Sequence, residues 1–260
     1  MSTDFFGKLF DWRKCKRKFH PGRFVGAGPV NWWPLANHRK ETAKLAKAGI
    51  PCYHIELFGW ADSHGYDKPG KVKQELDRLL FWCRRRRLSL FVSVVNDNIH
   101  LSKYGNTPLK LEQYRSAITG LMQHLKKRQK KQIYIQPVGE TQTAAGRAIE
   151  LEAAGIFPQD RLVYNGNGGR PGSRPGWAGY IAHHAARHKD AVPAGAWDVT
   201  DHGTRLNEMG GTGAQSYNND YLEADARKAS QRGCPYIMYG FQVRKLDKGN
   251  LRAIARGYYS

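Results

Sequence analysis

The chain has 260 residues, of which 40% are apolar, and its mean hydropathy is −0.65. Its formal net charge is +20, with a sequence isoelectric point of about 9.9. This length is common for one α/β barrel domain. The sequence holds no run of about 18 apolar residues, so we expect no transmembrane helix. So large a charge surplus predicts affinity for polyanions, among them nucleic acid, anionic lipid and acidic glycans.

Residues 1–22 combine basic and aromatic side chains, and we expect them to form an arm that precedes a domain over 23–260. The break at His20-Pro21-Gly22 marks the entry to that domain. The arm either packs its aromatic residues under the domain or contacts a membrane or nucleic acid as an amphipathic segment. It has neither the uninterrupted apolar run nor the cleavage site of a secretory signal. We therefore expect a cytoplasmic or virion-associated protein, which in the second case acts at a bacterial envelope.

A strand followed by a helix recurs eight times along the domain. The expected strands are 24–28, 52–58, 89–95, 132–138, 161–165, 191–197, 213–217 and 235–240. The expected helices are about 38–48, 70–86, 109–130, 143–154, 176–188, 203–208, 219–232 and 247–256, and Gly49, Gly155 and Gly233 are the expected C-caps. In the second helix, Leu76, Leu79, Leu80 and Cys83 have the spacing of one buried face. Eight such units predict a single (β/α)8 TIM barrel of the α/β class.

An open doubly wound sheet is the main alternative, and its glycine fingerprint fails here. The loop after the first strand reads Gly26-Ala-Gly-Pro-Val, with no third glycine opening a helix. The glycine-rich stretch 166–172 lacks the Lys-Ser/Thr pair of a P-loop. We therefore expect no cofactor and no metal. The scattered cysteines Cys15, Cys52, Cys83 and Cys234 are expected to be buried, reduced thiols.

Two runs of positive charge lie where helices end and strands begin, which is the lower end of such a barrel. Arg84–Arg87 precedes the third strand and Lys126–Lys131 precedes the fourth. Cations at a helix C-terminus complement its dipole, but that effect fades within one turn. These runs, together with the N-terminal arm, indicate either a basic underside that binds nucleic acid or an anionic envelope polymer, or a merely solvated face.

The upper end, where the strands finish, collects carboxylates, amides and tryptophans. The fourth strand stops abruptly at Glu140. The residues expected to contact a ligand are Trp32, Trp33, Trp60, Asn96, Asp97, Gln136, Asn165, Trp197, Tyr217, Asn218 and Tyr239. With Trp177, five of the seven tryptophans belong to this end. Tryptophans stack on sugar rings and amides bind hydroxyl groups, so the set predicts a carbohydrate site.

The chain resembles the (β/α)8 glycoside hydrolases, particularly the cellulase-like clan whose catalytic acid/base glutamate ends the fourth strand. Glu140 is the matching residue, although Gly139 stands where the clan has an asparagine. The clan's nucleophile is a glutamate that ends the seventh strand, and the expected seventh strand, 213–217, has no carboxylate. The resemblance implies that Glu140 protonates the leaving oxygen and that a second carboxylate acts as nucleophile or base. Asp198, ending the expected sixth strand, and Glu56, near the end of the second, are the candidates.

Each of these carboxylates also has a structural interpretation. Glu56 shares the parity of Cys52 and His54 along its strand, and it is then a buried carboxylate inside the barrel. In the structural interpretation, Asp198 caps a helix or loop before Thr200. Glu140 is then an N-cap-like acid at the start of the helix that follows it.

Two other functions remain open from the sequence. A metal-dependent phosphodiesterase or nuclease would suit the positive charge, with ligands drawn from His54, Glu56, His100, Glu140, Asp198, Asp201 and His202. The third possible function is non-catalytic: the barrel would be associated with a phage or virion and would bind a polyanion through its basic underside.

Overall fold

A computed structural model describes residues 25–27, 38–57, 69–96, 108–128, 133–166, 173–183, 196–200, 219–231, 236–238 and 248–260. The expected N-terminal arm, 1–22, lies outside these ranges.

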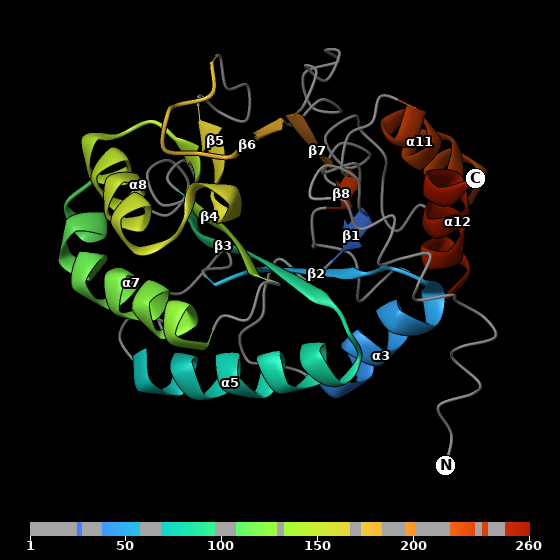
Figure 1. The fold of residues 1–260 in the computed structure, drawn as a ribbon, viewed down its shortest axis with the longest axis horizontal. Coiled ribbons are helices and arrows are strands. Elements are labelled where there is room, and N and C mark those ends of the chain that lie inside the picture. Colours follow the sequence, from blue (N-terminus) through green and yellow to red (C-terminus); the bar gives the residue numbers. More distant parts are fainter. Residues whose placement is uncertain are drawn as a thin grey trace, which may run out of the picture.

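Within the described ranges, eight parallel strands close into a barrel in chain order, as the sequence predicted (Figure 1). They are β1 (Val25–Ala27), β2 (Cys52–Glu56), β3 (Ser89–Asn96), β4 (Ile133–Thr141), β5 (Val163–Gly166), β6 (Tyr180–His183), β7 (Ala196–Thr200) and β8 (Tyr236–Met238). The ring closes where β1 pairs with β8, with Gly26 opposite Ile237. Because all strands run in one direction, their C-terminal ends meet at one mouth.

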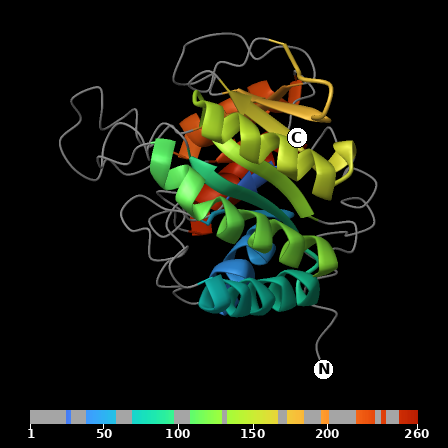
Figure 2. The same ribbon diagram turned by 90° about the vertical axis from the view of Figure 1, so that its left-hand side faces the viewer.

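Helices cover the outside of the barrel (Figure 1). They are α3 (His38–Ala48), α5 (Pro69–Arg85), α7 (Pro108–Arg128), α8 (Ala144–Ile156), α11 (Asn219–Gln231) and α12 (Lys248–Tyr259), with a short 3-10 turn at Gln159–Arg161. Figure 2 shows α5, α7 and α8 side by side against one wall. No helix in the described ranges is long and apolar enough to cross a lipid bilayer.

The hydrophobic core lies between the outer faces of the strands and the helices. The predicted face of α5 is confirmed, since Leu76, Leu79, Leu80 and Cys83 are all buried. They pack with strand residues such as Val92, and each fully buried leucine contributes about 1.5–3 kcal/mol. Cys52 and Cys83 are free thiols in the protein interior, as expected, whereas Cys15 and Cys234 lie outside the described residues.

The order of strands six and seven corrects the sequence prediction. The expected sixth strand, 191–197, overlaps the seventh strand of the barrel, β7. The sixth strand is β6, which lies inside the helix expected over 176–188. The expected seventh strand, 213–217, and the short helix, 203–208, lie outside the described residues. The alanine- and histidine-rich sequence after Tyr180 has good helix propensity, and pairing between neighbouring strands overrides it.

The predicted C-caps have mixed outcomes. Gly49 is confirmed: its φ of 83° lies in the left-handed region, and the amide of Ile50 returns to the carbonyl of Leu45 at 3.0 Å. The prediction for Gly155 is wrong, because α8 continues to Ile156. Gly233 lies outside the described residues.

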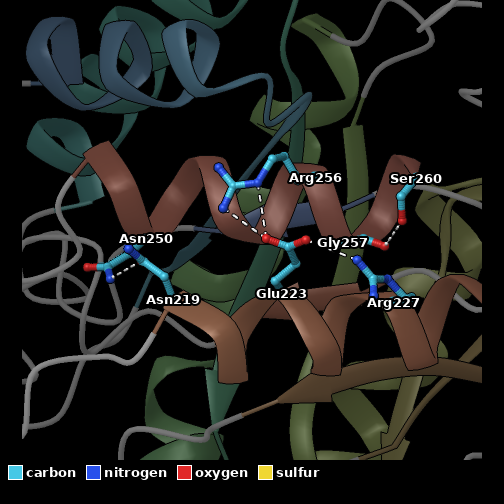
Figure 3. A network of polar contacts seen from close by, with 7 residues as sticks. All are labelled: Asn219, Glu223, Arg227, Asn250, Arg256, Gly257 and Ser260. Atoms are coloured by element: carbon cyan, nitrogen blue, oxygen red, sulfur yellow. Dashed lines mark hydrogen bonds and ion pairs between the residues drawn. The ribbon is translucent and has the colours of Figure 1, made fainter.

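The two C-terminal helices form a closely packed pair (Figure 3). Glu223 of α11 accepts hydrogen bonds from Arg256 of α12 at 2.8 and 3.0 Å, and from Arg227 at 3.0 Å. At the other end of the pair, Asn250 donates to Asn219 at 2.8 Å. These polar contacts set the register of α12, which also packs on β1 and α3 and so helps to close the barrel.

His38 begins α3 and is buried, and among the described residues neither ring nitrogen has a hydrogen-bond partner. Its ring packs edge-on against Tyr53, with 6.2 Å between ring centroids. Burial lowers the pKa of His38 from 6.5 to about 4 because the charged imidazolium loses its hydration.

We therefore expect His38 to make unfolding pH-dependent. Between 6.5 and about 4 the unfolded chain binds a proton at His38 and the folded chain does not. The free energy of unfolding is therefore highest above pH 6.5 and falls toward pH 4, by at most about 3 kcal/mol. Urea titrations at about pH 7 and about pH 4 should show a smaller loss for His38→Phe than for wild type. In His124→Gln, the control, the loss should change less than in His38→Phe, because burial lowers the pKa of His124 as well but Asp77 opposes that effect. An equal loss in His38→Phe and wild type would contradict the assignment.

Candidate active site

Glu140 lies at the C-terminal end of β4, at the mouth of the barrel, as predicted. β4 pairs with β5 through Gly139 opposite Asn165 and Thr141 opposite Gly166, and the register shifts between these two pairs. Glu140 is therefore the extra residue of a β-bulge. Bulges redirect a side chain and are common beside active sites.

The backbone of Glu140 is strained. Its φ is 52°, in the left-handed region that costs an ordinary L-residue about 1–2 kcal/mol. The side chain is nevertheless buried, with 2% of the residue exposed. Strain of this kind persists only where the surrounding structure enforces it, and it concentrates at functional sites.

The next two residues anchor this strand end to α8. Thr141 donates a hydrogen bond to the buried carboxylate of Glu150 on α8. Thr143 is the N-cap of α8, and its hydroxyl accepts the amide of Gly146 at 3.0 Å. Thr143 therefore caps α8, and the interpretation of Glu140 as the N-cap of this helix is wrong.

Polar side chains line the strands that lead up to Glu140. His54 Nε2 lies 3.0 Å from Ser93 Oγ, and the His54 ring stacks on Phe91 with centroids 4.7 Å apart. Ser93 stands opposite Gln136 on β4, and Asn165 on β5 is fully buried. Such groups are costly to bury unless they are hydrogen-bonded, so a polar layer here indicates a role beyond packing.

Gln136 is the least satisfied member of this layer. The residue has no exposed surface, and neither polar atom of its amide has a hydrogen-bond partner in the part of the chain that the structure describes. An unmet buried amide costs about 1–3 kcal/mol. A water molecule or ligand hydroxyl that reaches it recovers that energy.

The structure places the candidate second carboxylates on two different strands. Glu56 ends β2 and stands in register with Ser93. Asp198 lies on β7, opposite His183 of β6 and Tyr236 of β8. Asp198 therefore belongs to the seventh strand, not to the sixth as predicted, and the seventh strand does carry a carboxylate.

The other predicted ligand contacts divide into two groups. Asn96 ends β3 and Trp197 lies on β7, so both belong to strands of the barrel. The remaining residues, Trp32, Trp33, Trp60, Asp97, Tyr217, Asn218 and Tyr239, lie outside the described residues. The prediction for Trp177 is corrected: it precedes the start of β6, it packs edge-on against Tyr164 with 5.7 Å between centroids, and it packs against the hydrophobic core.

The sequence analysis did not single out Ser93, it placed Thr143 at the start of a helix without assigning it as the N-cap, and it placed His183 on a helix. Ser93 had a signal in the sequence, since it is a polar residue with the parity of Phe91 in the middle of the apolar run Leu90–Val95. Thr143 had one as well, because threonine immediately before an alanine-rich helix is a preferred N-cap. His183 had none that local propensity could reveal.

A scan against protein-family models finds no match, and a search of curated proteins finds none either. Solved structures, by contrast, include many similar folds. Cel5A of Thermotoga maritima, a mutant form in complex with cellobiose, is 12% identical, with a TM-score of 0.59 over 92% of this chain and 98% of that chain. A broad-specificity endoglucanase from an uncultured bacterium is 10% identical, with a TM-score of 0.56 over 92% and 95%.

A third similar structure is a glycoside hydrolase family 5 enzyme of Prevotella bryantii in complex with a xyloglucan tetradecasaccharide. It is 9% identical, with a TM-score of 0.54 over 92% of this chain and 96% of that chain. At such identities the comparisons establish the fold, and the chain has the (β/α)8 barrel found in these glycoside hydrolases.

Proposed function

We propose that this protein is a glycoside hydrolase in which Glu140 is the general acid/base. The observation that carries the proposal is the strained, buried bulge that holds Glu140 at the end of the fourth strand. Thr143 is the N-cap of α8, so helix capping does not account for the strained backbone at Glu140. A carboxyl group fixed at the mouth of a barrel is suited to protonate a leaving glycosidic oxygen.

The second carboxylate in this proposal is Asp198, and Glu56 is the alternative. Asp198 is favoured because it lies on the seventh strand, two residues before its end, and in the clan that this chain resembles a glutamate at the end of that strand is the nucleophile. Glu56 lies across two strand pairings from β4, opposite Ser93, which in turn stands opposite Gln136. Carboxyl groups about 5–5.5 Å apart would retain the anomeric configuration, and about 6.5–9.5 Å would invert it.

The substrate class that we propose is a polysaccharide or a cell-envelope glycan. The similar structures bind cellobiose and a xyloglucan oligosaccharide according to their descriptions. In this chain the buried amides of Gln136 and Asn165 supply hydrogen-bonding groups below Glu140. Trp32, Trp33 and Trp60 are the proposed stacking residues of the loops.

Substitution of the two candidates separates their roles. Asp198→Asn should lower kcat/KM by about 10²–10⁴-fold on the best substrate, because the group opposite the acid/base is lost. Glu56→Gln should lower kcat/KM by less than about tenfold, which corresponds to a loss of less than about 1.4 kcal/mol in transition-state stabilisation. The assay is reducing-end release from soluble β-glucans, xyloglucan and peptidoglycan, with proton NMR of the first product to assign its anomer.

The opposite pattern, with Glu56→Gln inactive and Asp198→Asn active, would transfer the role to Glu56. Hydrolysis of none of these glycans by wild type would remove the support for a glycosidase. A metal-dependent phosphodiesterase and a non-catalytic barrel would then be the functions to test.

A metal-dependent phosphodiesterase is one of those alternatives. In the described ranges no three His, Cys, Asp or Glu side chains come together as ligands, and His100, Asp201 and His202 lie outside those ranges. A stoichiometric divalent metal in the purified protein, with hydrolysis of a phosphodiester, would favour it. The other alternative is a non-catalytic, phage- or virion-associated barrel, which the basic underside would serve.

A further inference from the structure

The C-terminal ends of α5 and α7, together with Arg39 in the first turn of α3, carry a basic surface patch, which we call the basic face. It consists of Arg39, Arg84, Arg85, Arg86, Arg87, Lys126, Lys127 and Arg128, together with Phe81 and Trp82. Arg84, Arg85 and Arg87 are exposed, and so are Lys126 and Lys127. Arg84 donates a hydrogen bond to the carbonyl of Arg128 at 2.7 Å, so the two charged helix ends adjoin.

An aromatic residue organises part of this charge. The guanidinium groups of Arg39 and Arg86 both lie over the Trp82 ring, 5.5 and 4.7 Å from its centroid. Stacking on an indole holds a planar guanidinium in place while its N–H groups remain able to donate. The charges are therefore partly ordered before any partner arrives.

The basic face has little internal compensation. In the ranges that the structure describes, no carboxylate forms an ion pair with Arg84, Arg85 or Arg87. Asp77, nearby, is already engaged by Arg128 and His124. Uncompensated like charges repel one another in the free protein, so an anion that binds here relieves that repulsion.

Arg86 shows the same repulsion. Its pKa is lowered by burial and then by the neighbouring charges of Arg39 and Arg85. Nη1 of Arg86 is buried, and among the described residues it has no hydrogen-bond partner.

Phe81 distinguishes the basic face from a simple cationic patch. It is 53% exposed and packs edge-on against Trp82, with 5.0 Å between centroids. Between α5 and α7, a small recess has apolar walls and two guanidinium groups; it is lined by Leu80, Cys83, Arg84, Leu88, Leu90, Arg128 and Ile133. An exposed aromatic ring among arginines suits a ligand that has both phosphates and flat bases.

We propose that the basic face binds single-stranded nucleic acid, with arginines on the phosphates and Phe81 stacked on a base. Single-stranded nucleic acid is favoured over a duplex because a base must be unstacked to reach Phe81. It is favoured over a poly(glycerol phosphate) envelope polymer because that polymer has no ring to stack. Ile133 and Glu140 lie at opposite ends of β4, roughly 20–25 Å apart at about 3.3 Å per residue, so this site is separate from the proposed catalytic site.

The test is fluorescence anisotropy of the full chain with a labelled oligothymidylate of about 20 nucleotides, titrated with salt. Wild type should bind it more tightly than the matching duplex or poly(glycerol phosphate), with a log–log salt slope of about −0.7 per phosphate contacted. Phe81→Ala should weaken binding by about 5- to 150-fold through the lost stacking. Arg85→Gln should make the slope less steep by about 0.7 without lowering the melting temperature.

Two matched controls lie outside the basic face. Leu151→Ala removes another exposed apolar side chain, on α8, and Lys228→Gln removes an exposed charge on α11. Both should bind the oligonucleotide as wild type does. The proposal is overturned by absence of binding at low salt, by equal or tighter binding of the duplex or poly(glycerol phosphate), or by a Phe81→Ala affinity equal to that of Leu151→Ala.

Discussion

Glu140→Gln is expected to lower kcat/KM for glycan hydrolysis by about 10²–10⁴-fold, the range that one general acid/base contributes. Glutamine keeps the shape of the side chain but cannot deliver a proton to the leaving oxygen. Substrates whose leaving group needs no protonation, such as activated aryl glycosides, should lose less, because the first step then no longer depends on Glu140. The measurement is the ratio of wild-type to variant rates on a natural glycan and on an aryl glycoside. Full activity on the natural glycan would end the assignment.

The strained backbone at Glu140 supplies an independent check that does not depend on knowing the substrate. Glycine adopts a φ of 52° without strain, so Glu140→Gly should unfold with a free energy about 1 kcal/mol higher than that of Glu140→Gln. Both variants should lose about 10²–10⁴-fold in kcat/KM on the natural glycan. A glycine variant less stable than the glutamine variant would show that the side chain at this position is structural.

Gly257→Ala is expected to have the largest effect on stability. A Cβ at Gly257 would meet the carbonyl oxygen of Glu223 on α11 at a distance that non-bonded atoms do not reach. The two helices would have to separate, which would also disturb the contacts of Glu223 with Arg256. Such overpacking costs about 1–3 kcal/mol, and we expect the upper end, because the clash is with backbone. Chemical denaturation followed by circular dichroism gives the free energy.

Gly155→Ala is the matched control for this substitution. Gly155 also lies within a helix, α8, but a Cβ there would have no heavy atom within 4 Å. Alanine should therefore raise the free energy of unfolding by about 0.5–1 kcal/mol, the difference in helix propensity. If both variants lost stability equally, helix-pair packing would not be the cause.

The sequence by itself predicted the architecture, because periodicity is a local property. Leu76, Leu79 and Leu80 follow one another at helical spacing, and their burial follows from that spacing. The apolar run of the fourth strand was predicted to stop at Glu140, and β4 ends one residue later, at Thr141.

Tertiary structure alone decided the strand order near the C-terminal half of the barrel. Residues 180–183 open an alanine-containing stretch, 180–188, that predicts a helix, and pairing with β5 and β7 makes them a strand. That one change moves Asp198 from the sixth strand to the seventh, where a catalytic partner for Glu140 is expected.

The site itself depended still more on tertiary contacts. The bulge at Glu140 arises from a mismatch in register between β4 and β5, which no single strand encodes. The meeting of His54 with Ser93 joins residues from two strands through the curvature of the barrel. Local sequence therefore determined which segments are strands and helices and where β4 ends. The closure of the barrel determined which side chains stand beside Glu140, because those neighbours come from parts of the chain that meet only when the ring is complete.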